Sequence, residues 1–292
     1  MKRIASLRRI GLVVKEGNEA GMKTGRIVEK WLSERGIESV TILHPCQHVA
    51  ECLPKETDLL LVLAGDGTMV SVARQALGMN IPIAGINFGK VGFLAELDFY
   101  SWEKALERAI SKGLPVEQRM SLHFSLRRGQ DTILQGEVIN DVVVTRGKVA
   151  RLVSLLLGVN GAPFIALRSD GLILSTPTGA SGYAGSAGGP LLLPTLNNYV
   201  VAAICPYLSS FPPLVLEHGT RFSVKVGEAA PDLYLTLDGQ EAHPLAEGDV
   251  LTVSGMPGRI LVADFMVKDY FKRLRQVGFV QESKRTSRSS QE

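Results

Sequence analysis

At 292 residues, the chain is long enough for two modest domains, and its 45% share of hydrophobic residues can supply a core for each. Its 32 basic and 29 acidic residues give a net charge of only +3, which excludes an extended basic face for nucleic acid. The apolar runs are far shorter than the ~20 residues of a membrane helix, and the N-terminal segment does not resemble a secretory signal. We therefore expect a cytoplasmic protein that binds neither membranes nor nucleic acids.

The first hundred residues alternate apolar runs with amphipathic stretches. Continuous apolar runs predict buried strands at residues 10–14, 40–43, 59–63 and 81–86. Helical spacing predicts helices at residues 20–35, 69–77 and 102–111, the second of them capped by Thr68. This alternation is typical of a parallel sheet covered on both faces, so residues 1–114 are predicted to form an α/β nucleotide-binding domain.

The composition changes after Gly113 and Pro115, which mark a break. Short β-branched and apolar runs follow at residues 122–126, 142–145, 152–158, 172–175, 200–205, 222–226, 233–237 and 250–253. Short strands separated by turns predict a mostly antiparallel, β-rich domain over residues 115–270. Residues 271–292 are expected to be a C-terminal tail whose polar end, from residue 281, is disordered.

Three cysteines, Cys46, Cys52 and Cys205, are too few and too scattered for a disulfide framework, which fits a reducing compartment. Cys46 and Cys52 lie near His44 and His48 in the sequence, but their spacing matches no known zinc motif. A loop or a helix start is the simpler interpretation of this cluster, and its role stays open.

The segment Ala64–Thr68, with the sequence AGDGT, joins a predicted strand to a predicted helix, at the edge where open α/β sheets bind ligands. Gly65 and Gly67 can let a polyphosphate approach the backbone, and the N–H groups at a helix start favour anions. Asp66 would repel phosphate, unless it orients an attacking hydroxyl and accepts its proton, as kinases require. The alternative is a tight turn in which Asp66 only hydrogen-bonds the backbone.

Three shorter segments have weaker patterns. Residues 85–94 contain three glycines, which suit either close approach to a ligand or an interdomain loop. Asn140-Asp141, directly before a strand, can hold a ribose diol because a carboxylate accepts hydroxyl protons, but it is also a common turn pair. Residues 237–240 place Asp-Gly between apolar runs and predict a hairpin.

The longest motif covers residues 170–190. From Ser175 to Pro190, fifteen of sixteen residues are Gly, Ala, Ser, Thr or Pro, and Tyr183 is the exception. Small residues leave room for a ligand, and a tyrosine can stack on a flat base. A flexible linker is the alternative. Because a linker rarely follows directly from an apolar strand such as residues 172–174, the pattern favours a binding loop.

Taken together, in this order and at these separations, the segments resemble the bacterial NAD kinase family. The matching motifs are AGDGT, INFGKVGFLAEL, NDVVV, DGLILSTPTGASGYAGSAGGP, ICPYLSSFPPLVL and LDGQE. The resemblance implies transfer of the terminal phosphoryl group of ATP to the 2′-hydroxyl of the adenosine ribose of NAD. It also implies that Mg²⁺ or another divalent cation accompanies ATP, with no dedicated metal ligands in the protein, and that the protein is a homo-oligomer, a dimer or tetramer.

The resemblance also assigns site residues by position. Asp66 resembles the catalytic base of the family. The substrate-binding positions are Gly67, Asn140, Asp141, Arg151, Arg168, Asp170, Ser181, Gly182, Tyr183, Ala184, Gly185, Ser186 and Gln240. Among these, Asn140 and Asp141 match the pair that holds ribose hydroxyls, and Tyr183 matches the aromatic stacking residue. The sequence departs from the family at Ala64, which is usually glycine, and at residue 180, where a hydroxyl is lost.

Arg168 further predicts which redox state of the dinucleotide is used. Arg168 precedes Asp170 by two residues, so on one strand both side chains would point to the same face. The resemblance places that face against the ligand, where a guanidinium restricts the pocket. We therefore expect NAD to be preferred over NADH.

Two other functions fit the sequence less well. A lipid kinase can share the GDGT-type loop, but the loop around Tyr183, the DGQ turn and the lack of a basic amphipathic helix argue against it. A non-catalytic dinucleotide sensor would gain nothing from a carboxylate beside phosphates, so the presence of Asp66 argues against that function.

Overall fold

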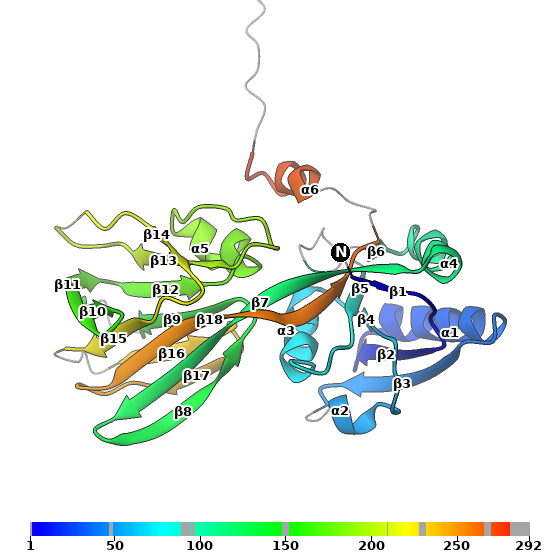
Figure 1. Cartoon of the computed structure of the whole chain (residues 1–292), viewed down its shortest axis with the longest axis horizontal. Coiled ribbons are helices and arrows are strands. Elements are labelled where there is room, and N and C mark those ends of the chain that lie inside the picture. The colour runs from blue at the N-terminus through cyan, green and yellow to red at the C-terminus, as the bar shows by residue number, and fades with distance from the viewer. Residues whose placement is uncertain are drawn as a thin grey trace, which may run out of the picture.

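The computed structural model describes residues 2–46, 49–88, 94, 97–147, 152–208, 210–227, 232–265 and 270–280. These residues form two lobes that share a long pair of strands (Figure 1). The pair consists of β7 (Leu114–Arg128) and β18 (Val250–Ala263), which are antiparallel to each other and run from one lobe into the other. Through this pair, a single sheet of 12 described strands extends across both lobes.

The N-terminal lobe is built on a parallel sheet in the order β3-β2-β4-β5. Its strands are β2 (Arg9–Lys15), β3 (Glu38–His44), β4 (Leu59–Leu63) and β5 (Ile83–Asn87), with β1 (Lys2–Ile4) and β6 (Leu97–Asp98) at the margins. Its helices are α1 (Glu19–Ser33), α2 (Val49–Cys52), α3 (Asp66–Gln75) and α4 (Trp102–Lys112).

Strand β4 shows why helices cover both faces of this sheet. Successive side chains of a strand point to opposite faces. Leu59, Leu61 and Leu63 pack with residues of α1 and α4, whereas Leu60 and Val62 pack with residues of α3. All five side chains are fully buried. The strand is therefore apolar throughout its length, as expected for a central parallel strand.

The C-terminal lobe is a sandwich of two antiparallel layers. One layer is a six-stranded sheet in the order β14-β13-β12-β9-β16-β17, and the other is the antiparallel part of the 12-stranded sheet. The six strands are β9 (Asp141–Arg146), β12 (Gly171–Ser175), β13 (Asn198–Ile204), β14 (Leu214–Glu217), β16 (Leu233–Leu237) and β17 (Glu241–Pro244). The facing layer holds β8 (Asp131–Val138), β10 (Val153–Val159), β11 (Ala162–Ser169) and β15 (Phe222–Val226) beside β7 and β18.

A single apolar core lies between these two layers. It includes Val142 and Val144 from β9, Leu155 from β10 and Leu251 from β18. The predicted fold class, an α/β N-terminal part with a parallel sheet followed by a mostly antiparallel β-rich part, is confirmed. The predicted division at residues 114 and 115 stays a prediction, because β7 and β18 extend through both lobes.

One local expectation was wrong. Thr68 does not cap α3, since that helix begins at Asp66 with Gly65 as the N-cap residue, and the N–H groups of Thr68 and Met69 both donate to the Gly65 carbonyl. The C-terminal tail over residues 271–292 stays a prediction, and its start belongs to helix α6 (Tyr270–Gln276), which was not predicted. Residues 281–292, which were expected to be disordered, lie outside the described residues.

The segment of small residues after β12 folds against the connection between β8 and β9. It contains a short 3₁₀ helix, η1 (Gly179–Ser181), and a single turn of helix, α5 (Tyr183–Ser186). The Thr176 hydroxyl donates to the Ile139 carbonyl at 2.6 Å and accepts the Gly179 N–H at 3.1 Å. The segment is therefore anchored and partly helical, which contradicts the flexible-linker alternative.

Gly179 is predicted to be required for this anchoring. A Cβ at this position would overlap the carbonyl oxygen of Asn140 and lie 2.7 Å from the Ser175 hydroxyl. We expect Gly179→Ala to lower the free energy of unfolding by about 1–3 kcal/mol, as overpacking does. Urea denaturation measures the change. Gly219→Ala is the matched control, because a Cβ there meets no atom within 4 Å. Equal stability of the two variants would show that the overlap is relieved at no cost.

Candidate active site

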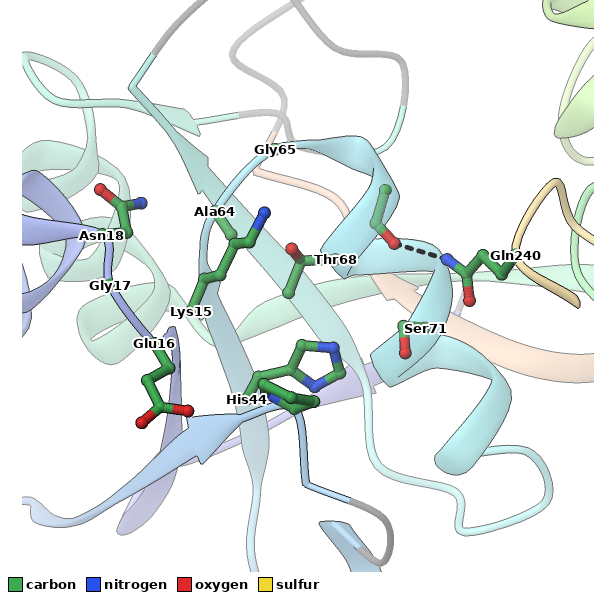
Figure 2. A pocket seen from close by; sticks show the side chains of 12 residues that line it. Lys15, Glu16, Gly17, Asn18, His44, Ala64, Gly65, Thr68, Ser71 and Gln240 are labelled. Carbon is green, nitrogen blue, oxygen red and sulfur yellow. Dashed lines mark hydrogen bonds between the residues drawn. The ribbon is translucent and has the colours of Figure 1, made fainter.

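A cavity in the N-terminal lobe lies at the carboxyl ends of its parallel strands. This cavity of about 750 Å³ is bounded by the ends of β2 and β3 and by the first turn of α3 (Figure 2). Lys15 and His44 border it as the last residues of those strands, and Thr68 and Ser71 contribute hydroxyls from α3. Burial, and then the nearby Lys15, lower the pKa of His44. The lining thus combines the Lys15 side chain, the Glu16 carboxylate and the N-terminus of α3, and the helix N-terminus favours anions.

Asp66 is the first residue of α3, directly beside this cavity. The predicted position of the AGDGT segment is confirmed, since it leads from β4 into α3. Gly65 adopts extended backbone, and Asp66 Oδ1 accepts the backbone N–H of Leu94 at 3.3 Å. The carboxylate is half-buried and belongs to the helix turn whose N–H groups favour anions. Its role as a base stays a prediction.

The predicted hairpin over residues 237–240 is confirmed, and its turn contacts α3. Asp238 and Gly239 have φ values of 53° and 64°, and the Gln240 N–H donates to the Leu237 carbonyl at 2.9 Å. The Gln240 side-chain amide donates to the Gly67 carbonyl at 2.8 Å. Because Gly67 follows Asp66, the hairpin turn reaches the first turn of α3.

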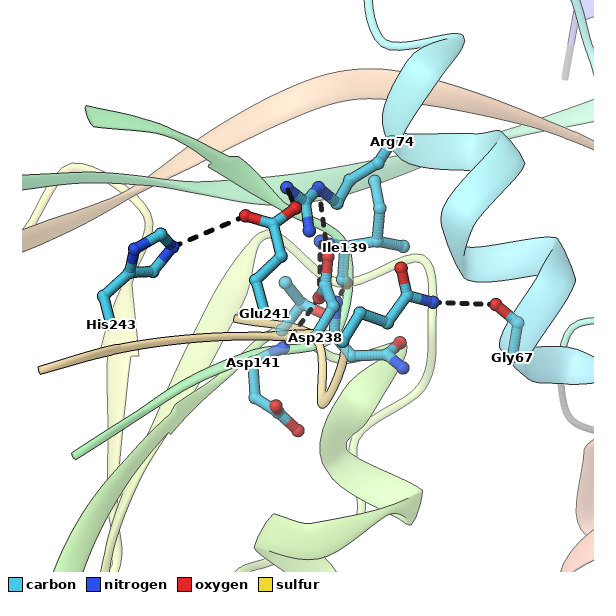
Figure 3. A network of polar contacts seen from close by, with 10 residues as sticks. Gly67, Arg74, Ile139, Asp141, Asp238, Glu241 and His243 are labelled. Atoms are coloured by element: carbon cyan, nitrogen blue, oxygen red, sulfur yellow. Dashed lines mark hydrogen bonds and ion pairs between the residues drawn. The ribbon is translucent and has the colours of Figure 1, made fainter. Parts of the chain in front are cut away.

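A second contact between the hairpin and α3 is ionic. The Arg74 guanidinium lies 2.5 Å from Glu241 Oε1 and 3.9 Å from Asp238 Oδ2 (Figure 3). Glu241 also lies 3.5 Å from the imidazole of His243. The side chain of Arg74 is only 22% exposed and that of Asp238 is fully buried, so these charges are poorly screened by solvent.

Asp238 also organises the connection between β8 and β9. Its carboxylate accepts the backbone N–H groups of Ile139 at 3.0 Å, Asn140 at 2.7 Å and Asp141 at 3.3 Å. Sequence reasoning identified Asp238 only as a turn residue. No local pattern reveals its second role, because the residues it holds are nearly a hundred positions away in the chain.

The two buried carboxylates of this network differ in their surroundings. Asp141 is 8% exposed, and burial together with the charge of Asp238 raises its pKa to about 7. Burial also raises the pKa of Asp238, although three N–H donors and Arg74 oppose the rise. Figure 3 shows the Asp141 side chain pointing away from Arg74, on the other side of the turn. Asp141 thus titrates near neutral pH, where a small change in surroundings alters its charge.

The loop residues predicted to bind the dinucleotide lie near this connection. The Ser175 hydroxyl donates to the Asn140 carbonyl at 3.2 Å, and Ala184 is fully buried beneath the segment. Tyr183 is 45% exposed, so its ring is available for stacking. The other predicted contacts in this segment, which are half-buried or exposed, are Ser181, Gly182, Gly185 and Ser186.

Two of the predicted substrate-binding residues, Arg168 and Asp170, lie away from this loop and from Asp141. In β12, Ser175 pairs with Asp141, whereas Gly171, at the other end of the strand, pairs with Thr145. Asp170 precedes Gly171 and therefore lies beyond the end of β12 that is far from Asp141. At ~3.4 Å per residue of strand, this places Asp170 about 14 Å or more from Asp141. Asp170 is bound by Arg146 at 2.8 Å, which lowers the pKa of the Asp170 carboxyl. Arg168 lies on β11, with its guanidinium 5.9 Å from the Tyr207 ring centre.

The expectation that Arg168 and Asp170 share one strand face was wrong. Strand β11 ends at Ser169, and Asp170 belongs to the connection to β12. The preference for NAD over NADH therefore loses this geometric support and stays a prediction. Arg151 lies outside the described residues, as do residues 89–93 and 95–96 of the INFGKVGFLAEL motif.

The raised pKa of Asp141 predicts how stability depends on pH. An acid whose pKa is higher in the folded state stabilises the protein below its unfolded pKa, near 4, and this stability is lost as pH rises through the folded pKa, about 7. Asp141→Asn removes that titration. Relative to the parent, its free energy of unfolding should therefore increase from pH 4 to pH 7, by about 1.4 kcal/mol for each unit of pKa difference.

Urea denaturation at a series of pH values measures this difference. Asp131→Asn, at an exposed carboxylate of β8, controls for the loss of one charge. A stability difference between Asp141→Asn and the parent that stays constant from pH 4 to pH 8 would contradict the raised pKa.

Comparison with known proteins identifies the family. The ATP-NAD kinase N-terminal domain matches residues 45–114, and the ATP-NAD kinase C-terminal domain matches residues 139–262. The chain is 40% identical over 283 residues to the NAD kinase of Oleidesulfovibrio alaskensis, covering 97% of both chains. It is 42% identical over 278 residues to the NAD kinase of Nitratidesulfovibrio vulgaris strain Miyazaki F, covering 95% of this chain and 98% of the relative.

Solved structures share the fold. Yeast NADH kinase complexed with NADH matches with a TM-score of 0.84 at 24% identity, covering 96% of this chain and 90% of that one. An NAD kinase from Archaeoglobus fulgidus in complex with ATP matches with a TM-score of 0.73 at 24% identity, covering 92% of this chain and 100% of that one. Among the described residues, no helix has the length and apolar character to span a membrane. The resemblance seen in the motifs is confirmed: the chain belongs to the NAD kinase family of phosphotransferases.

Proposed function

We propose that this chain transfers the terminal phosphoryl group of ATP to the 2′-hydroxyl of the adenosine ribose of NAD. One observation carries the proposal. The turn at residues 238–240 binds the first turn of α3 through Gln240 and the β8–β9 connection through Asp238. It therefore holds the predicted base, Asp66, and the predicted ribose-binding pair, Asn140 and Asp141, on the same side of the molecule.

The cavity at the end of the parallel sheet suits the triphosphate. Backbone N–H groups at the start of α3, the Lys15 ammonium and the hydroxyls of Thr68 and Ser71 border it. These groups provide positive potential and hydrogen-bond donors for phosphate oxygens. Among the described residues, no group of three or more His, Cys, Asp or Glu side chains is arranged to hold a metal ion. We propose that Mg²⁺ enters as part of the substrate, MgATP, where it neutralises phosphate charge.

The residues of the chain then act on the ribose. The ionised carboxylate of Asp141 accepts a proton from a ribose hydroxyl in a hydrogen bond, and Asn140 offers both a donor and an acceptor. Asp66 orients the 2′-hydroxyl and accepts its proton as the oxygen attacks the terminal phosphorus, whose bond to the bridging oxygen breaks to release ADP. The N–H groups at the start of α3 stabilise the charge on the transferring phosphoryl oxygens. Tyr183 stacks on a flat ring of the dinucleotide.

We further propose that the protein acts as a homo-oligomer. Strand β11 is an edge strand of the large sheet, and its Phe164 and Ile165 are 51% and 40% exposed. Exposed apolar edges favour association with another chain. Arg168 and Asp170 lie at this side of the lobe, away from Asp141 of the same chain. Such a position suits residues that contribute to the dinucleotide site of a neighbouring copy.

The role of Asp66 is tested by Asp66→Asn, which keeps the shape of the side chain and removes the base. We expect kcat to fall by ~10²–10⁴, as loss of a general base does. The KM for NAD should change only a few-fold, because Asn140 and Asp141 are proposed to hold the ribose in the ground state. Steady-state assays of NADP formation from MgATP and NAD measure both constants, with Asp131→Asn as the control. Turnover near that of the parent would remove Asp66 from the mechanism.

A further inference from the structure

Two cysteine thiols lie side by side next to the proposed triphosphate cavity. The Sγ atoms of Cys46 and Cys52 are 3.5 Å apart, and both cysteines are free. Cys52 is the last residue of α2 and is exposed, whereas Cys46 is half-buried against the apolar core beneath α2 and α3. A disulfide requires an S–S distance of ~2.0 Å, so the two sulfur atoms need to approach by only about 1.5 Å.

We propose that Cys46 and Cys52 form a reversible disulfide that alters the wall of the triphosphate cavity. The oxidant is a small-molecule disulfide. The thiolate of the exposed Cys52 attacks one sulfur of the oxidant and releases one thiol. The thiolate of Cys46 then attacks Cys52 Sγ and displaces the second thiol. The two cysteines lose two protons and two electrons. The oxidant gains these protons and electrons and becomes two thiols.

A metal site is a poorer explanation for this pair. Zinc sites use three or four protein ligands, in which thiolates are combined with histidines or with further cysteines. In the part of the chain that the structure describes, no third His, Cys, Asp or Glu completes such a set. The third cysteine, Cys205, follows β13 in the other lobe. Thiol–disulfide chemistry needs only the two groups that are present.

The position of the pair explains how a disulfide would reach the cavity. Cys46 directly follows His44 and Pro45, which line the cavity wall. Helix α2 is held in place at its other end, because Val49 is fully buried and its N–H donates to the Gln75 side chain of α3 at 3.0 Å. With this end of α2 fixed, the proposed disulfide would draw Cys46, and with it the wall at residues 44 and 45, toward α2.

We expect the oxidised form to bind the triphosphate more weakly, with an unchanged affinity for NAD. Only the wall at residues 44 and 45 moves, whereas the β8–β9 connection is held by Asp238 in another part of the molecule. We expect the KM for ATP to increase by about fivefold, which is the lower end of the typical effect of one site on the binding affinity of another. This effect on ATP rests on the proposed function, but the disulfide itself does not.

Thiol counting tests the disulfide. The reduced full-length protein is incubated with oxidised glutathione at about pH 9, because the contact with Cys46 raises the pKa of the Cys52 thiol and only the thiolate reacts. The disulfide is counted in Cys205→Ser, which lacks the other exposed thiol. Its free thiols, counted after denaturation, should fall from two to none without a glutathione adduct, and a peptide digest should join Cys46 to Cys52. Cys46→Ser should stop at a glutathione adduct on Cys52. Two remaining thiols in Cys205→Ser, a stable adduct on its Cys46 or Cys52, or a bond between chains would overturn the disulfide.

Kinetics of the same samples test its effect on the cavity. In the parent and in Cys205→Ser, oxidation should raise the KM for ATP and leave the KM for NAD unchanged, and dithiothreitol should reverse the change. Cys46→Ser and Cys52→Ser should keep the KM of the reduced parent after removal of any adduct. A disulfide that forms without changing the KM for ATP overturns the effect on the cavity. A reduced parent without kinase activity overturns the proposed function and leaves the disulfide result intact.

Discussion

The carboxylate of Asp238 is the constraint on which the candidate site depends. It is buried, and it accepts N–H groups from three successive residues, Ile139 to Asp141. A buried carboxylate is strongly unfavourable without such partners. Hydrogen bonds to a charged group contribute about 1.5–3 kcal/mol each, so the three donors and Arg74 together offset a large desolvation cost. The β8–β9 connection can satisfy its own N–H groups in this way only if it lies against the hairpin turn.

This arrangement joins two lobes that fold around different cores. The turn belongs to the antiparallel sandwich, while its partners Arg74 and Gly67 belong to α3 of the parallel sheet. Strands β7 and β18 already connect the lobes through the backbone, and the hairpin adds a side-chain connection at the site itself. Catalysis by positioning depends on holding reacting groups within a fraction of an ångström, which favours residues fixed by several bonds.

The sequence predicted best those features that depend on residues close together in the chain. Strand β4 was predicted with its observed bounds because all five of its residues are apolar. The strand-to-helix turn at Asp66 followed from the change of pattern between β4 and α3. The Asp-Gly hairpin followed from short-range chemistry, since few residues other than glycine, asparagine and aspartate adopt positive φ readily. Family resemblance then supplied the substrate, which no spacing argument could.

Long-range relations were beyond the sequence. The roles of Asp238 and Arg74 depend on contacts between segments far apart in the chain, which a local pattern cannot report. Strands β7 and β18 were predicted as short segments because polar residues and Pro115 interrupt their apolar runs, although their backbone pairing continues. Arg168 and Asp170 were placed on one strand because the sequence does not show that β11 ends at Ser169, directly before the bend at Asp170.

Asp238 couples α3 to the ribose-binding pair, and a double-mutant cycle measures this coupling. Arg74→Gln, Asp238→Asn and the double variant are compared by kcat/KM for NAD at saturating MgATP. We expect each single change to lower kcat/KM by roughly tenfold or more. The double variant should be less impaired than the sum of the two single effects, with a coupling energy of about 1 kcal/mol or more. Effects that add to within about 0.5 kcal/mol would contradict it, because the two residues would then act independently.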